Sequence, residues 1–181
     1  MTVLLDIDFL GDGRLRSRLA RWSLAIFAVG LLASLLLAVV LEPDASPLGP
    51  AMQFLLLAAA TLVSMPVHEL VHALFFRLMG GRGTRVHFGH AAGMLYAGCP
   101  GLVLPRARFL CVLLAPAVLV TGALVLLGMV FDLHFIGMLA ASIHLSSCAG
   151  DLLAAWLIAR EPACTHCEDT EVGVRLLAAG A

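Results

Sequence analysis

Four long apolar segments alternate with short polar or glycine- and proline-rich stretches along the chain. They cover residues 22–41, 51–79, 109–131 and 135–159. An α-helix rises 1.5 Å per residue, so about 20 apolar residues cross the roughly 30 Å hydrocarbon core of a bilayer. Each segment is long enough for one crossing. The pattern therefore predicts an all-α membrane protein, with four transmembrane helices in a single domain that spans residues 1–181.

Residues 80–107, between the second and third apolar segments, have a different pattern. Glycines recur there, and β-favouring side chains come in pairs, Val86 with Phe88 and Leu95 with Tyr96. Such pairs bounded by glycine are typical of a β-hairpin. We therefore expect a short β-like re-entrant hairpin between the second and third helices.

The arginines predict the orientation of the chain. All 11 basic residues are Arg: four precede the first apolar segment, five lie around residues 80–107 and two follow the fourth segment. The loops at 42–50 and 131–135 hold none. Positively charged loops stay in the cytoplasm. We expect both termini, including a charged tail at 160–181, to be cytoplasmic in a protein of the bacterial plasma membrane.

Composition supports a membrane protein and argues against nucleic acid as a partner. The chain is 61% hydrophobic and 13% charged, whereas a soluble domain is about half apolar and about a quarter charged. The net charge of −1 comes without a basic patch. The five cysteines, an odd number, argue against a disulfide scaffold. Cys164 and Cys167 could be half a metal site, but no second CxxC completes it, so we expect a solvent-facing tail.

The second apolar segment contains the sequence His68-Glu69-Leu70-Val71-His72. In a helix, residues four apart share a face, so both imidazoles can reach one metal ion while Glu69 holds a water beside them. Each ionisable group at mid-bilayer costs roughly 2.5–3.5 kcal/mol, which makes an idle trio expensive. A polar contact between helices is the simpler alternative. The pattern favours a zinc site.

A catalytic zinc takes three protein ligands and keeps one position open for water. Between the motif and the C-terminal tail the only carboxylates are Asp132 and Asp151. Asp132 falls in the outer loop. Asp151 lies nine residues before Arg160, and His72 lies eight residues before Gly80. At 1.5 Å per residue both lie about 12–14 Å from the cytoplasmic end. Depth therefore predicts Asp151 as the third ligand.

Other polar residues offer alternatives. His144 could donate a hydrogen bond to a reacting oxyanion, support a ligand from the outer shell, or serve only in helix packing. It belongs to one predicted polar stripe, at helical spacing, formed by His144, Ser147, Cys148 and Asp151. His87 and His90 in the loop could replace Asp151 as ligands, although Asp151 would then be buried in the membrane without a metal.

H-E-L-V-H in one apolar segment and Gly150-Asp151 in a later one resemble the bacterial "putative zincin peptidase" family, short relatives of the site-2 intramembrane zinc metalloproteases. The resemblance covers about residues 55–175 and includes the glycine-rich stretch ending in Tyr96, Leu104-Pro105-Arg106 and Ala115-Pro116. It implies zinc ligation by His68, His72 and Asp151, with Glu69 catalytic. In one departure, site-2 proteases carry Leu-Asp-Gly and an upstream Asn, whereas this chain has Gly-Asp-Leu and His144.

These features predict a membrane-embedded zinc metallopeptidase. Its partners would be the lipid bilayer and a membrane-associated, transmembrane or peptide substrate, cleaved near the cytoplasmic side. Two other classes stay open: a non-catalytic scaffold or regulator with a relict zinc site, and a small metal or proton carrier. A carrier would distribute ionisable groups across the membrane, whereas here they cluster at one depth. The sequence favours no particular oligomeric state.

Overall fold

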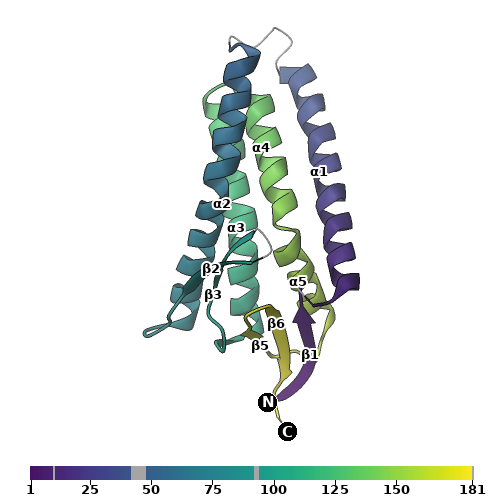
Figure 1. Ribbon diagram of the computed structural model, residues 1–181, viewed down its shortest axis with the longest axis vertical. Coiled ribbons are helices and arrows are strands. Elements are labelled where there is room, and N and C mark those ends of the chain that lie inside the picture. The colour runs from purple at the N-terminus through teal and green to yellow at the C-terminus, as the bar shows by residue number, and fades with distance from the viewer. Residues whose placement is uncertain (10, 42–47, 92–93, 181) are drawn as a thin grey trace. The chain divides into compact units, whose positions relative to one another are not determined.

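The computed structural model describes residues 1–9, 11–41, 48–91 and 94–180, which contain five helices and six strands (Figure 1). In chain order these are β1 (Thr2–Asp8), α1 (Gly13–Leu41), α2 (Pro50–Gly80), β2 (His87–Ala91), β3 (Met94–Gly98), β4 (Val103–Pro105), α3 (Arg106–Val130), α4 (His134–Ser147), α5 (Ala149–Arg160), β5 (His166–Asp169) and β6 (Gly173–Ala178).

The chain folds into two compact units. Unit 1 consists of Met1–Ala20, Glu69–Pro116 and Gly150–Ala181, and unit 2 consists of Arg21–His68 and Ala117–Ala149. Helices α1, α2 and α3 each run from one unit into the other. Each unit is described by itself below.

Helices α1, α2 and α3 are long and apolar enough to cross a membrane, as the sequence predicts for its first three segments. The fourth predicted helix, residues 135–159, is divided into α4 and α5 at Cys148. This bent pair passes the same test when its two parts are taken together as one broken span. The described residues thus hold three such helices, or four with the pair, and the number of crossings stays a prediction.

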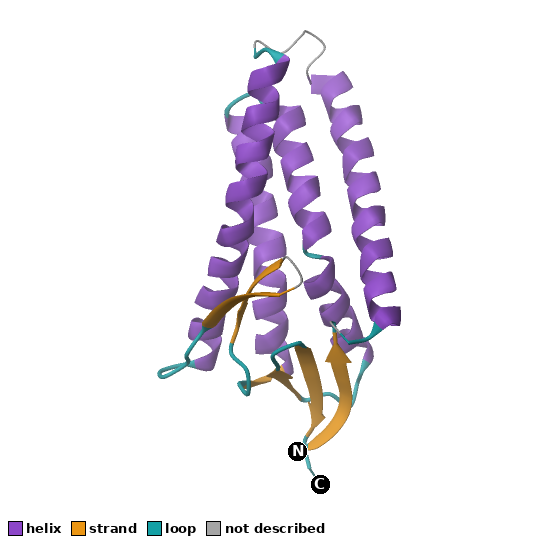
Figure 2. Cartoon of the chain, viewed as in Figure 1, coloured by secondary structure: helices purple, strands orange, loops and turns teal. Residues whose placement is uncertain are grey.

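A four-stranded sheet in unit 1 corrects the expected all-α fold. Its strands follow the order β1-β6-β5-β4, and each neighbouring pair is antiparallel (Figure 2). Thr2 pairs with Ala178, so the N- and C-terminal strands lie side by side. The expected charged tail at 160–181 is in fact β5 and β6. Arg175 on β6 donates to Asp6 on β1 and to Glu168 on β5, at 3.1 Å each.

Unit 1 also holds a two-stranded hairpin, in which β2 and β3 pair from His87 with Gly98 to Ala91 with Met94. Gly89 lies opposite Tyr96, and the Tyr96 ring occupies the space that a Cβ at residue 89 would need. An aromatic ring over a cross-strand glycine compensates for the missing side chain. Both strands lie within residues 80–107, and their re-entrant placement in a bilayer stays a prediction.

Small residues allow close helix packing in unit 2. The Cα of Gly137 on α4 lies against Gly128 on α3, where an added Cβ would come within 2.7 Å of it. Gly30 on α1 faces Ser142 on α4 in the same way. Helix pairs in membranes use such small residues because they let backbones approach.

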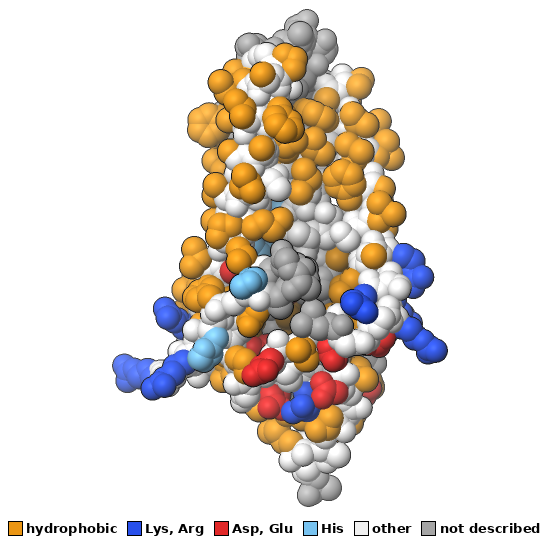
Figure 3. Space-filling view, viewed as in Figure 1, with side chains coloured by type: hydrophobic (Ala, Val, Ile, Leu, Met, Phe, Trp, Pro, Cys, Tyr) orange, Lys and Arg blue, Asp and Glu red, His pale blue; other side chains and the backbone are white. Residues whose placement is uncertain are grey.

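The helices and the strands differ in the kind of side chain at their surface. Apolar side chains cover the long helices in the view of Figure 3, whereas acidic side chains gather over the strands. Among the exposed apolar residues of α1 are Leu24, Val29, Leu36, Val39 and Val40. Contiguous exposed apolar surface of this kind suits contact with lipid.

Candidate metal centre

His72 on α2 has one ring nitrogen fixed by the backbone of α3. Its Nδ1 lies 3.1 Å from the carbonyl oxygen of Val112. In an α-helix that carbonyl would accept from the amide four residues later, but residue 116 is a proline and has no N–H. The Val112 carbonyl therefore has no helical donor and accepts a hydrogen bond from the His72 Nδ1–H instead. This hydrogen bond leaves Nε2 as the nitrogen with a lone pair.

The lone-pair nitrogen of His72 faces a carboxylate. Nε2 lies 3.4 Å from Oδ1 of Asp151, which is in the first turn of α5. Charge-assisted hydrogen bonds are shorter, about 2.7–2.9 Å. Two ligands on one tetrahedral zinc, with bonds of about 2.0–2.2 Å, lie roughly 3.4 Å apart. The pair therefore has the separation of two ligands of one metal ion, and both residues belong to unit 1.

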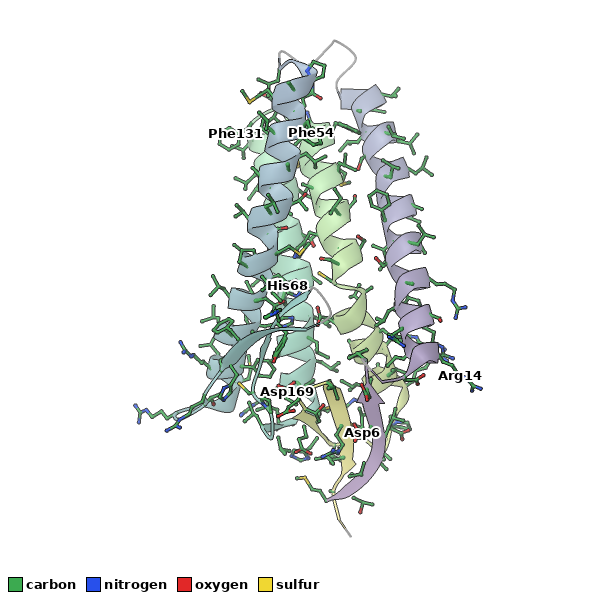
Figure 4. All side chains as sticks on the ribbon, viewed as in Figure 1. Asp6, Arg14, Phe54, His68, Phe131 and Asp169 are labelled. Atoms are coloured by element: carbon green, nitrogen blue, oxygen red, sulfur yellow. The ribbon has the colours of Figure 1, made fainter. Side chains whose placement is uncertain are left out.

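His68 lies one turn before His72 on α2, and in unit 2 it contacts His144. Its Nδ1 is 3.2 Å from Nε2 of His144, and the two rings meet edge to face (Figure 4 labels His68). The Sγ of Cys148 is 3.6 Å from the same Nδ1. The Oγ1 of Thr121 on α3 lies 2.9 Å from Nδ1 of His144. His68, His144 and Cys148 are all buried.

The fourth predicted helix is interrupted at Cys148, so the predicted polar stripe does not run along one continuous helix. The Cys148 amide is shared between the carbonyls of His144 and Leu145, at 3.2 Å each. Ser147 Oγ and Cys148 Sγ also donate to the His144 carbonyl. Side chains that bond back to the preceding turn compete with the helical ladder and bend helices. His144 therefore lies on α4 and Asp151 on α5, and the two are not on one continuous face.

The other predicted candidates lie elsewhere. Glu69 follows His68 on α2 and is half-buried. His87 and His90 are exposed on β2, and no group of three possible metal ligands among the described residues contains either one. The alternative in which they replace Asp151 therefore gains no support.

Cys164 and Cys167 are buried in unit 1, so the expected solvent-facing tail is wrong at these positions. Their sulfur atoms lie 3.7 Å apart, and Cys164 Sγ donates to the carbonyl of His166. Burial and the neighbouring Cys164 raise the pKa of the Cys167 thiol. A high pKa keeps the thiol protonated and unreactive. The pair is therefore part of the core of the sheet.

Sequence reasoning missed two residues that contact candidate ligands, Val112 and Thr121, and one buried carboxylate, Asp169. Val112 could have been found, because a proline four residues later marks a carbonyl without its helical partner. Thr121 gives no such signal, since its contact with His144 depends on tertiary packing. Asp169 on β5 accepts a hydrogen bond from the Cys99 amide. Burial raises the pKa of Asp169 to about 6.

Helices long and apolar enough to cross a membrane indicate a membrane protein, and the buried histidines, the carboxylate and the thiol are its candidate metal ligands. The family model described as "Putative zincin peptidase" matches residues 61–166, which is more than half of the chain. The chain belongs to this family. The matched range includes His68, Glu69, His72, His144 and Asp151. No curated protein and no solved structure matches the chain.

Proposed function

We propose that this protein is a membrane-embedded zinc metallopeptidase that hydrolyses membrane-associated or transmembrane substrates near the cytoplasmic side. The main support is the geometry of His72. Its Nδ1 is occupied by the Val112 carbonyl, and its Nε2 faces Asp151 at the separation expected of two zinc ligands. Metal-ligating histidines characteristically have the second nitrogen held in this way. Membership of a zincin family agrees with this chemistry.

The proposed ligands are His68, His72 and Asp151. The two histidines are four residues apart on α2 and thus share a face of that helix. Nδ1 of His68 contacts His144, so Nε2 is the atom that we assign to the metal. Two imidazoles and one carboxylate are a common set for catalytic zinc, which keeps a fourth position for water.

Zinc, when bound there, would polarise the scissile carbonyl and acidify the attacking water. Glu69 lies beside both histidines in the sequence and is not among the ligands. It accepts the proton of the water and returns it to the leaving nitrogen, as a general base and then a general acid. His144 positions His68 through the contact between their rings. It is therefore a positioning residue in this proposal.

The substrate must present an unwound backbone, because every carbonyl of a helix in lipid is already hydrogen-bonded. The β2–β3 hairpin pairs with no third strand among the described residues. An extended peptide can add to the outer edge of such a hairpin through main-chain hydrogen bonds. This hairpin is the element that we assign to holding the substrate extended.

The test compares zinc content and cleavage in four proteins. Wild type, Glu69→Gln, Asp151→Ala and the control Asp132→Ala are purified and reconstituted with labelled single-span peptides. Glu69→Gln should keep wild-type zinc and lose cleavage by about 100-fold or more. Asp151→Ala should lose both zinc and cleavage, and Asp132→Ala should keep both.

Four results would contradict the proposal. Full cleavage by Glu69→Gln would show that Glu69 is not the general base. Full zinc content in Asp151→Ala would show that Asp151 is not the third ligand. A wild-type protein that binds zinc and cleaves no peptide favours the scaffold. Zinc transport into sealed vesicles that is lost in Asp151→Ala would favour the carrier.

A further inference from the structure

His68, His144 and Cys148 form a cluster whose thiol has no role in the proposed peptide hydrolysis. All three are buried in unit 2, and their ligand atoms lie within 4.8 Å of one another. Peptidase chemistry would account for His68 as a ligand and for His144 as its support. It gives no role to a fully buried thiol beside both rings. Cys148 has 0% exposure, and its sulfur contacts both imidazoles.

The distances in this cluster match a tetrahedral metal site. With bonds of about 2.0–2.1 Å to nitrogen and 2.3 Å to sulfur, two nitrogens on one ion lie roughly 3.3 Å apart, and a nitrogen and a sulfur roughly 3.6 Å apart. The two histidine nitrogens are separated by 3.2 Å. Cys148 Sγ lies 3.6 Å from Nδ1 of His68 and 3.9 Å from Nε2 of His144. One ion can therefore reach all three atoms with little movement.

The second nitrogen of His144 is also held as in a metal ligand. Its Nδ1 lies 2.9 Å from Oγ1 of Thr121. When Nδ1–H donates to that hydroxyl, Nε2 directs its lone pair at His68 and Cys148. Metal-ligating histidines use their other nitrogen in this manner, and the contact fixes the ring orientation.

We propose that His68, His144 and Cys148 form a second metal site, which takes a soft d¹⁰ cation such as Cd²⁺ or Cu⁺. A thiolate with two imidazoles selects thiophilic ions over hard ones such as Mg²⁺ or Ca²⁺. On binding, the Cys148 S–H bond breaks, the sulfur–metal bond forms with the sulfur electron pair, and the proton passes to solvent. The metal undergoes no redox change.

A consequence that rests on the proposed function concerns His68, which both sites share. A neutral imidazole has one lone pair and one N–H. Its Nδ1 cannot bind the soft cation while Nε2 holds zinc unless the ring loses its remaining proton. The two ions therefore compete for His68, and occupancy of the second site inhibits the peptidase.

The test is a Cd²⁺ titration of the purified full-length protein, followed by thiolate-to-cadmium charge-transfer absorption in the ultraviolet. Wild type is compared with Cys148→Ser and with the control Cys111→Ser, which removes an exposed thiol on α3. The remaining cysteines contribute equally to all three proteins. Cys148→Ser should lose the absorption of one thiolate, and Cys111→Ser should match the wild type. A Cys148→Ser titration that superimposes on the wild type overturns the proposal.

Two further variants keep Cys148 intact. Thr121→Val removes the hydroxyl that orients His144 and should weaken Cd²⁺ binding by about 10-fold or more. An unchanged affinity in that variant would overturn the assignment of His144 as a ligand. His72→Ala removes a ligand of the proposed catalytic zinc and should leave the charge-transfer signal of Cys148 unchanged. These variants therefore test the second metal site independently of the proposed peptidase activity.

Discussion

A proline that deprives a carbonyl of its helical partner explains the orientation of His72. Pro116 has no amide hydrogen, so the carbonyl of Val112 accepts from the His72 ring. Thr121 contacts the His144 ring in a similar way. Both groups belong to α3, which contributes no proposed ligand. At this scale α3 supplies the two groups that contact the Nδ1 atoms of His72 and His144.

Pro116→Ala tests this role of the proline. Alanine restores an amide that competes with His72 for the Val112 carbonyl, so the ring loses its fixed orientation. We expect zinc affinity to fall by about 10-fold, within the 10–100-fold range for partners of metal ligands. Metal competition with a chelator measures the affinity. Pro105→Ala, a proline in β4 outside the helices, should have no effect, and an equal effect of both variants would contradict the explanation.

Asp169 makes the stability of the protein depend on pH. Burial raises its pKa from 3.8 to about 6, so the folded state holds this proton more tightly than the unfolded chain. The contribution of Asp169 to the free energy of unfolding is therefore highest below pH 4 and falls as the pH rises towards 6. A shift of this size corresponds to roughly 3 kcal/mol.

Asp169→Asn should remove this dependence, because the amide stays neutral and its oxygen can still accept from the Cys99 amide. We expect the variant to match the wild type near pH 4 and to be more stable at pH 7. Chemical unfolding in detergent at both values measures the difference. Glu171→Gln, an exposed carboxylate in the turn after β5, is the control. If the wild type and Asp169→Asn show the same dependence of stability on pH, Asp169 is not the group responsible.

At the scale of elements, the sequence predicted those helices and strands that depend on neighbouring residues, and it did not predict those that depend on residues far apart in the chain. Apolar runs of about 20 residues predicted α1, α2 and α3 because burial in lipid needs only length and composition. The pairing of Thr2 with Ala178 joins the two ends of the chain, and no local pattern reveals it. At the break near Cys148, side chains bond back to the His144 carbonyl, and hydropathy does not register such bonds.

The candidate site divides in the same way. The His68–Glu69–His72 motif is local to one helix, and helical periodicity predicts its geometry. Depth along two helices predicted that Asp151 lies near His72, and their 3.4 Å separation agrees with that prediction. The contact between His68 and Cys148 was not predictable, because it depends on how α2 packs against the end of α4.

Helix packing in unit 2 predicts a specific sensitivity to added methyl groups. A Cβ at Gly128 on α3 would lie 2.7 Å from the Gly137 backbone on α4, which cannot move aside as a side chain can. Gly128→Ala should therefore cost about 1–3 kcal/mol of stability by overpacking. Gly122→Ala is the matched control on the same helix, because a Cβ there meets no atom of the described residues within 4 Å. Thermal unfolding in detergent compares them, and equal melting temperatures would contradict the close approach.

For the whole molecule, the four-stranded sheet limits how the chain can cross a membrane. β1 precedes α1, β4 lies between α2 and α3, and β5 and β6 follow α5. Strands that share hydrogen bonds must be on one side of the bilayer, so the chain crosses an even number of times between any two of them. Helices α1 and α2 would give two crossings if each spans the membrane once. A crossing by α3 after β4 requires one further crossing before β5, because β4 and β5 are paired. We infer that α4 and α5 together make that crossing.

The arginines add the direction to this parity argument, because they lie next to the strands along the chain and the positive-inside rule predicts a cytoplasmic location for them. Single cysteines in a background without the five native ones test both inferences. Gly49→Cys and Phe131→Cys should react with an impermeant maleimide in intact cells. Arg85→Cys and Glu171→Cys should react only after permeabilisation. External labelling of Glu171→Cys alone would make α4 and α5 a re-entrant pair and break the sheet across the bilayer, which the antiparallel pairing of β4 with β5 forbids.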